Sequence, residues 1–397
     1  MSDKKHGSLP AADGVRRASH HRIDAEISRI ETIPIRLPFK GDFKIASGGV
    51  RLGIDILIVR LHSRSGLVGI GETQAWLRQG SRETLASLNS IIHGHFAARV
   101  IGRSAFDAAA ILSDLEEAVW HSNYAIAPIA DAMLDLQGKI LGVPAYELLG
   151  GRARESVAVG ITLGIKKDLG ALVAEARSRF EEGFTSFTVK VGEDLVRDAE
   201  AVRALCEGLG EAATIRADGN SGMDLAAAMK FMNRVKDLPL DAIEQPLPPW
   251  DLDGMAELAL RYDIPMMADE CVSAPEDLLA VIRKRAASVF QTKIAKNGGA
   301  WRCKALWEIG SAAGLRIFPG NHPGASVVTA AALHLATAWP GPLLEGPMAV
   351  GVNEILAEDV LTEPIRRVGK HMHAGDGPGL GIELDEEKLQ RFRVDLV

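Results

Sequence analysis

The sequence predicts an α/β protein in which a barrel of alternating strands and helices follows a separate α+β unit. From about residue 157, short apolar segments alternate with helical stretches over about 190 residues, which is the rhythm of a (β/α) barrel. Before that point, strand-like segments come first and helical segments come second, as in an α+β unit. The length of 397 residues fits one barrel with such an addition.

The α+β unit begins with three strand patterns that are rich in β-branched residues and separated by Gly or Ser. We expect strands over 30–39, 54–63 and 66–73. The stretch 41–50 between the first two contains Gly and Ser, and it is predicted to be a mobile flap. In 81–96 and 127–142, apolar residues recur at steps of three and four. That spacing predicts two helices after the strands.

The barrel region contains eight short apolar segments with helical stretches between them. The expected strands are 157–164, 186–192, 213–220, 241–246, 264–270, 288–294, 315–320 and 342–346. The expected helices include 169–183, 195–210 and 275–287. A doubly wound sheet is the alternative, but it usually carries a Gly-rich phosphate turn after its first strand. The G-x-G in 66–73 is followed by charged Glu72 and opens no helix pattern, so the barrel is favoured.

Composition and charge exclude several classes of function. The chain has 45 Lys and Arg against 52 Asp and Glu, a formal net charge of −7, so we expect no nucleic-acid partner. No window of about 18 uncharged apolar residues occurs, so no membrane span is expected. The three cysteines fit neither a disulfide framework nor a thiolate zinc site, which predicts a cytoplasmic location. Residues 1–22 lack an apolar signal-peptide core and are expected to form a flexible tail.

Charged residues stand at the ends of successive predicted barrel strands. In chain order they are Lys190, Asp218, Glu244, Asp269 and Lys293. The steps between them correspond to one strand and one helix each, so the residues recur at the same height on neighbouring strands. The carboxyl ends of barrel strands are where barrel enzymes place their active sites.

The residue types point to metal-assisted proton transfer. Three carboxylates that converge from adjacent strands repel one another at low dielectric. A divalent cation relieves that repulsion, and all-oxygen ligands favour Mg²⁺ or Mn²⁺ over zinc. A partly desolvated lysine near a cation has a lowered pKa and exchanges protons near neutrality. Metal and lysine together can form an enolate from a small carboxylate. The alternative is that each acid caps the following helix. It could explain a single acid, but it does not explain why all the charged residues recur at matching strand ends.

These motifs resemble the enolase superfamily, in its muconate-lactonising-enzyme subgroup. The resemblance is carried by FTVKVG (187–192), RADGN (216–220), AIEQPL (242–247), ADE (268–270) and KIAKNGG (293–299). Segments 132–151 and 377–389 support it outside the barrel. It implies a modified TIM barrel, (β/α)7β, under an α+β capping domain built from both chain ends. The implied boundaries are 1–22 for the tail, 23–150 for the capping domain, 151–354 for the barrel and 355–397 for the returning C-terminal segment. The resemblance also implies a homo-oligomer, a dimer or an octamer.

Carried over by position, the resemblance implies that three carboxylates are the metal ligands, namely Asp218, Glu244 and Asp269. Lys190 would be the acid/base lysine of the family's K-x-K motif, and Lys293 a second one on the opposite face of the substrate. Asn220 and Glu270 would support the metal ligands. Mg²⁺ or Mn²⁺ would be the cofactor.

The chain departs from the family pattern at three places. Thr188 replaces the first lysine of K-x-K, so Lys190 is expected to keep a higher pKa than in relatives. The segment PGNHPGAS (319–326) differs from the Gly-rich loop of muconate cycloisomerases. LLEGP (343–347) lacks the D-x-D of dipeptide epimerases, so that activity is disfavoured.

Several residues in these and other segments are candidate substrate contacts. They are Thr188, His322, Glu345, Phe43 and Tyr124, with Trp76 as a similar case. For each, an ordinary packing or loop role is the alternative.

The overall reading is a metal-dependent enzyme that moves the α-proton of a small carboxylate. Muconate-type cycloisomerisation comes first by resemblance. A racemase, epimerase or dehydratase of an amino-acid-like or hydroxy acid is the alternative. From other classes, a non-catalytic ligand-binding descendant and a Schiff-base aldolase remain open. An aldolase would use one lysine without the three carboxylates.

Overall fold

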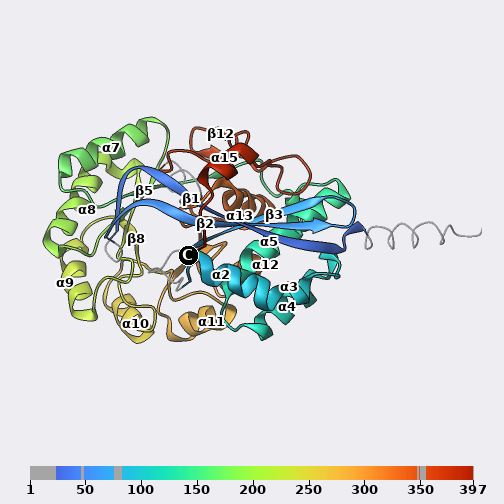
Figure 1. Ribbon diagram of the computed structural model, residues 1–397. Coiled ribbons are helices and arrows are strands. Elements are labelled where there is room, and N and C mark those ends of the chain that lie inside the picture. The colour runs from blue at the N-terminus through green and yellow to red at the C-terminus, as the bar shows by residue number, and fades with distance from the viewer. Residues whose placement is uncertain (1–23, 46–48, 76–82, 347, 349–354, 397) are drawn as a thin grey trace, which may run out of the picture.

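The computed structural model describes residues 24–45, 49–75, 83–346, 348 and 355–396. Figure 1 shows an antiparallel sheet near the N-terminus packed beside a curled parallel sheet ringed by helices. The expected architecture, an α/β barrel with an α+β capping domain, is confirmed. No helix in this described part is long and apolar enough to cross a membrane.

The capping domain opens with three antiparallel strands in sequence order. They are β1 (Ile27–Ile45), β2 (Gly49–Ser63) and β3 (Val68–Ala75). Its helices are α2 (Leu85–Ile91), η1 (Ile92–Phe96), α3 (Ala97–Val100), η2 (Ala105–Asp107), α4 (Ala108–Ala118), α5 (Asn123–Leu141) and α6 (Ala145–Leu148). The first two strands continue into the stretch predicted as a flap, where Phe43 pairs with Arg51 and Lys44 with Val50. Most of the expected loop is therefore strand.

The barrel has seven parallel strands in the order of the sequence. They are β5 (Ile161–Leu163), β6 (Ser186–Lys190), β7 (Thr214–Asp218), β8 (Leu240–Glu244), β9 (Met266–Ala268), β10 (Val289–Lys293) and β11 (Arg316–Gly320). A helix follows each strand: α7 (Leu169–Glu181), α8 (Leu195–Leu209, continued by η3, Gly210–Ala212), α9 (Leu225–Val235), α10 (Leu252–Arg261), α11 (Pro275–Lys284), α12 (Ala300–Ala312) and α13 (Ser326–Ala338). Four of these helices begin after an aspartate that accepts main-chain N–H groups of the first turn. These N-caps are Asp168, Asp194, Asp224 and Asp251.

Two of the eight predicted barrel strands differ from expectation. The first is split, because β4 (Val157–Ala158) leaves the barrel to pair with β13 (His371–Met372), next to β12 (Arg367–Val368). The segment 342–346 forms no strand. It closes the barrel with one main-chain bond on either side, from Leu344 N to Ile317 O at 2.9 Å and from Gly160 N to Gly346 O at 3.1 Å. Single bonds of this kind are too few for a ladder.

Gly346 allows this closure, because its backbone lies directly against β11. A Cβ at this position would lie 1.8 Å from the main-chain oxygen of Pro319. Gly346→Ala should lower the free energy of unfolding by about 2 kcal/mol or more, measured by urea titration. Gly94→Ala is the matched control, since no atom of the described residues lies within 4 Å of a Cβ added there. A loss at Gly346 no larger than at Gly94 would contradict this account of the closure.

The C-terminal segment returns to the capping domain, as Figure 1 shows for α15 (Glu386–Phe392) beside β1. Ile35 of β1 bridges to Arg393, and Phe39 bridges to Leu356. The four domain boundaries given above remain predictions.

The capping domain also binds the barrel through buried side chains of α5. Asp131 accepts the main-chain N–H of Ala300, the first residue of α12, at 2.9 Å. Asn123 donates from Nδ2 to the main-chain oxygen of Lys296 at 3.0 Å. These contacts lie at the end of the barrel where the strands terminate, so the capping domain covers the expected active-site face.

Asp131 should make the stability of this interface depend on pH. Burial raises its pKa from 3.8 to about 7, against the hydrogen bond from Ala300. A carboxyl with a raised pKa stabilises the fold below its unfolded pKa, and this stabilisation is lost as pH rises through the folded pKa. Asp131→Asn removes the titration and keeps an acceptor. The free energy of unfolding of the variant minus that of wild type should rise by on the order of 2 kcal/mol between about pH 4 and pH 7. Urea titrations at both pH values check this, and an unchanged difference would contradict it.

Candidate active site

The carboxyl ends of the parallel strands bring the expected charged residues to one level of the barrel. Lys190 at the end of β6 lies opposite Asp218 of β7, which lies opposite Glu244 of β8. Asp269 directly follows β9, and Lys293 ends β10. The three carboxylate residues are at most 2% exposed. Strand register therefore gathers three buried acids between two lysines.

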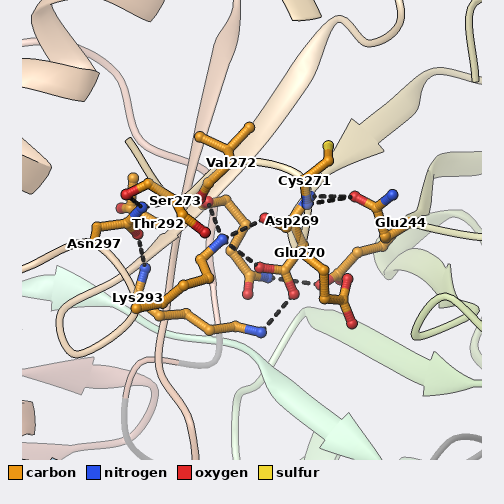
Figure 2. Close-up of polar contacts among 12 residues, drawn as sticks. Glu244, Asp269, Glu270, Cys271, Val272, Ser273, Thr292, Lys293 and Asn297 are labelled. Carbon is orange, nitrogen blue, oxygen red and sulfur yellow. Dashed lines mark hydrogen bonds and ion pairs between the residues drawn. The ribbon is translucent and has the colours of Figure 1, made fainter. Parts of the chain in front are cut away.

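Each of the two flanking carboxylates is bound by a lysine ammonium group. Lys190 donates to Asp218, and Lys293 donates to Asp269. A third lysine, Lys296, donates to the other carboxylate oxygen of Asp269 at 2.8 Å and also to its main-chain oxygen. Figure 2 shows the polar contacts around Asp269 and Lys293. Positive and negative groups thus neutralise one another inside the barrel mouth.

Glu244 lies between these two ion pairs, and among the described residues no lysine donates a hydrogen bond to it. Its Oε1 accepts from Gln291 Nε2 at 2.9 Å. Burial and the charges of Asp218 and Asp269 raise the pKa of Glu244 well above its usual range. The three carboxylates therefore repel when all are ionised, and a divalent cation would remove that repulsion.

The pKa values of the lysines reflect the same charges. Burial acts to lower the pKa of Lys190, but the charges of Asp218 and Glu244 outweigh burial and raise it. The same balance, with Asp269 as the strongest charge, raises the pKa of Lys293. Burial alone would raise the pKa of Asp269, but its lysine partners lower it. With these partners both lysines are protonated at neutral pH.

Asn220 and Glu270 lie beside the carboxylates and offer further oxygen atoms. Asn220 donates to Asp218 from its main-chain nitrogen at 2.8 Å and from Nδ2 at 3.0 Å. It also donates to Glu270 Oε1 at 3.3 Å. Asn220 Oδ1 and Glu270 Oε2 are buried without a hydrogen-bond partner among the described residues. Burial and the charges of Asp269 and Asp218 raise the pKa of Glu270 to about 8.

The donor set fits a hard divalent cation. Its oxygens are carboxylate and amide oxygens, two of them lack partners, and no sulfur or imidazole is needed. In the described part of the chain, no three acidic, His or Cys side chains already surround one point as in a metal site. The ammonium groups of Lys190 and Lys293 instead bind Asp218 and Asp269. Asp218, Glu244 and Asp269 could hold the metal if those ammonium groups moved aside.

Three site residues received no role from the sequence. Besides Lys296 and Gln291, Gln245 accepts the main-chain N–H of Asp269 at 3.0 Å through Oε1. Gln291 stands two residues before Lys293, on the same face of β10. That spacing could have identified it. Lys296 lies beyond the strand, so only the three-dimensional turn brings it back to Asp269.

Thr188 lies on the same face of β6 as Lys190, because side chains two residues apart point the same way. It is buried, one level deeper in the barrel than the ammonium group. The expectation that Lys190 keeps a higher pKa than the same lysine in relatives stays a prediction.

His322 and Tyr124 meet at the boundary between barrel and capping domain. Their rings stack with centroids 6.0 Å apart and an interplanar angle of 22°. Burial and the charge of Lys293 lower the pKa of His322 well below its usual range, so the imidazole is neutral. Burial and the charges of Asp269 and Glu270 raise the pKa of Tyr124. The Tyr124 hydroxyl is buried without a hydrogen-bond partner in the described chain. Both residues therefore lie close to the carboxylates.

Of the three other candidate contacts, Glu345 is the one that the structure places. Glu345 accepts from Thr185, just before β6 begins, and pairs with Lys370 at 2.7 Å. It lies at the opposite end of the barrel from the charged cluster, so a substrate contact does not fit its position. The backbone of Phe43 lies in β1, but its side chain is outside what the structure describes, and Trp76 lies outside the described residues altogether.

Two family models match most of the chain. Residues 30–150 match the mandelate racemase / muconate lactonizing enzyme N-terminal domain. Residues 171–388 match the enolase C-terminal domain-like model. The first covers the strands and helices of the capping domain, and the second covers most of the barrel with the returning segment.

Individual relatives agree with this match over nearly their whole length. Muconate cycloisomerase 1-1 from Acinetobacter lwoffii is 32% identical over 93% of this chain and 97% of its own. An N-succinylamino acid racemase from Thermus thermophilus is 32% identical over 94% and 98%. The crystal structure of muconate lactonizing enzyme from Pseudomonas fluorescens with muconolactone superposes with a TM-score of 0.89, 32% identity and coverage of 94% and 100%. The chain is therefore an enzyme of the mandelate racemase / muconate lactonizing enzyme family, in the muconate lactonizing enzyme subgroup of the enolase superfamily.

Proposed function

We propose that this enzyme moves the α-proton of a small carboxylate through an enolate, with a divalent metal ion in the barrel mouth. The observation that carries the proposal is the row of three buried carboxylates at matched strand ends, with a lysine bound to each outer member. An aldolase lysine would not need this row. A ligand-binding descendant would have no reason to keep both lysines.

Each residue of the row has a proposed role. Asp218, Glu244 and Asp269 would hold Mg²⁺ or Mn²⁺, which binds the substrate carboxylate and stabilises the enolate charge. Asn220 would orient Asp218 through its two hydrogen bonds. Glu270 would add negative charge beside them.

The lysines would be able to exchange protons when the carboxylates bind a metal ion instead of the lysine ammonium groups. The attraction of those charges is what raises the pKa of Lys190 and Lys293, whereas burial lowers it. Once the attraction weakens, burial dominates and each Nζ can take or give a proton near neutral pH. Placed at the two sides of the carboxylate row, the lysines would serve opposite faces of the α-carbon.

Muconate-type cycloisomerisation is the first candidate for the overall reaction. It rests on the cycloisomerase relative and on the muconolactone complex with the same fold. Racemisation of an N-acylated amino acid is the second. Two lysines suit racemisation, since one removes the proton and the other returns it. The racemase relative is also as similar in sequence to this chain as the cycloisomerase relative, at 32% identity. A cytoplasmic location and a homo-oligomeric state, dimer or octamer, stay predictions.

Turnover assays separate the two candidates. The enzyme with Mg²⁺ would be given cis,cis-muconate and a set of N-succinyl amino acids. We expect lactone formation or loss of optical rotation, respectively, and no activity in excess EDTA. Activity that persists in EDTA and is trapped by borohydride would favour a Schiff-base lysine and contradict the proposal.

A further inference from the structure

The loop between β11 and α13 carries His322 and runs into the first turn of α13. That turn is bound by a side chain from the capping domain. Glu72, on β3, accepts the main-chain N–H of Ala325 at 2.7 Å through Oε1 and that of Val328 at 3.0 Å through Oε2. Glu72 is completely buried. One carboxyl group therefore joins a strand of the capping domain to the start of a barrel helix.

The surroundings of Glu72 are built around this contact. Gln74 donates from Nε2 to Glu72 Oε1 at 3.1 Å. At Gly324, a Cβ would lie 2.3 Å from Gln74 Nε2 and 2.6 Å from Glu72 Oε1. The absence of a side chain at this position lets both capping residues reach the loop. Asp359 of the C-terminal segment accepts the Ser326 main-chain N–H at 3.2 Å, so the same turn is held from a second side.

His322 is thus fixed by the capping domain at two points. Its ring stacks on Tyr124 of α5, and its loop ends at the turn that Glu72 binds. We propose that Glu72 is a positioning residue for His322, which sets the imidazole beside the lysines only when the capping domain is docked. The catalytic consequence rests on the function proposed above and on His322 being a substrate contact, as the sequence analysis expects. The attachment of the loop does not.

The physical reason is the chemistry of a helix N-terminus. The first N–H groups of a helix have no partner inside the helix, and a buried one left unpaired is costly. The Glu72 carboxyl group accepts two N–H groups here. Burial raises its pKa to about 8, so the two hydrogen bonds rather than a charge hold the turn. An amide at position 72 keeps one acceptor and turns its NH₂ group toward the other donor. The first turn of α13 should then open more often, and the loop before it should open too.

Hydrogen exchange read by mass spectrometry tests the attachment without any substrate. In Glu72→Gln, peptides covering residues 320–328 should exchange about tenfold faster, whereas peptides from β7 and β10 stay unchanged. Asp135→Asn is the matched control. Asp135 is an equally buried carboxylate of the capping domain that accepts two main-chain N–H groups, from Leu380 and Ile70, away from this loop. In Asp135→Asn, the peptides covering residues 320–328 should exchange as in wild type.

Gly324→Ala tests the same contact from the barrel side and serves if Glu72→Gln fails to fold. Its effect on loop exchange should not add to that of Glu72→Gln, because both changes disrupt one contact. With a substrate in hand, Glu72→Gln should raise KM about tenfold and leave the affinity for Mg²⁺ within about twofold. Wild-type exchange in the loop of both variants would overturn the proposal. So would faster exchange spread evenly over the whole chain. If no substrate is found, the exchange result still decides.

Discussion

Lys293→Ala is expected to lower kcat by about a thousandfold, the loss typical of a removed acid/base group. Lys190→Ala should have a comparable effect on the other face of the substrate. On a racemisable substrate, each variant should still exchange the α-proton of one enantiomer with solvent but not that of the other. This pattern follows from placing one lysine on each side of the carboxylate row.

The measurement is deuterium incorporation into each enantiomer, followed by mass spectrometry. Lys304→Ala is the control, because Lys304 lies on α12 and pairs with nearby Glu308. It should leave kcat unchanged. Full turnover in both Lys190→Ala and Lys293→Ala would remove the two-lysine mechanism. If only one of the two variants loses turnover of a muconate substrate, the cycloisomerase hypothesis is favoured.

Asp218→Asn is expected to weaken Mg²⁺ or Mn²⁺ binding by at least about a hundredfold and to lower activity in parallel. The change removes one of the three proposed ligand charges and also the carboxylate that binds Lys190. Binding can be followed by Mn²⁺ paramagnetic resonance without any substrate. Asp224→Asn is a matched control six residues later, where an aspartate caps α9 by accepting from Ala227. It should affect stability and leave metal affinity unchanged. Unchanged affinity in Asp218→Asn would contradict the metal-site assignment.

The barrel could be predicted because its elements are coded locally. Each strand is a short apolar run, and several helices start at an aspartate cap within a few residues. The segment 342–346 shows where local coding ends. Its composition is strand-like, but a ladder needs several bonds in register with each neighbour. Here the segment makes one main-chain bond on either side, and Gly346 lies against Pro319. Which end of the barrel Glu345 faces also depends on that closure, so its contact with Thr185 could not be predicted from the local sequence.

The charged row was predictable because one strand and one helix separate its members, so spacing alone gives their common height. Other site residues depend on tertiary contacts that no local pattern contains. Lys296 reaches Asp269 only through a turn after β10. Glu72 acts on a helix more than two hundred residues further along the chain, through two main-chain N–H groups. The stacking of Tyr124 on His322 likewise requires the docked capping domain.

The most direct test of the central claim is proton exchange in D₂O. The purified enzyme with Mg²⁺ or Mn²⁺ would be incubated with muconolactone, proline derivatives and N-acyl amino acids, with EDTA as the control. Mass spectrometry would report deuterium at the carbon next to the carboxylate. We predict metal-dependent incorporation into at least one of these acids, lost in Asp218→Asn and kept in Asp224→Asn. Incorporation that is equally fast in EDTA would contradict metal-stabilised enolate chemistry at this site.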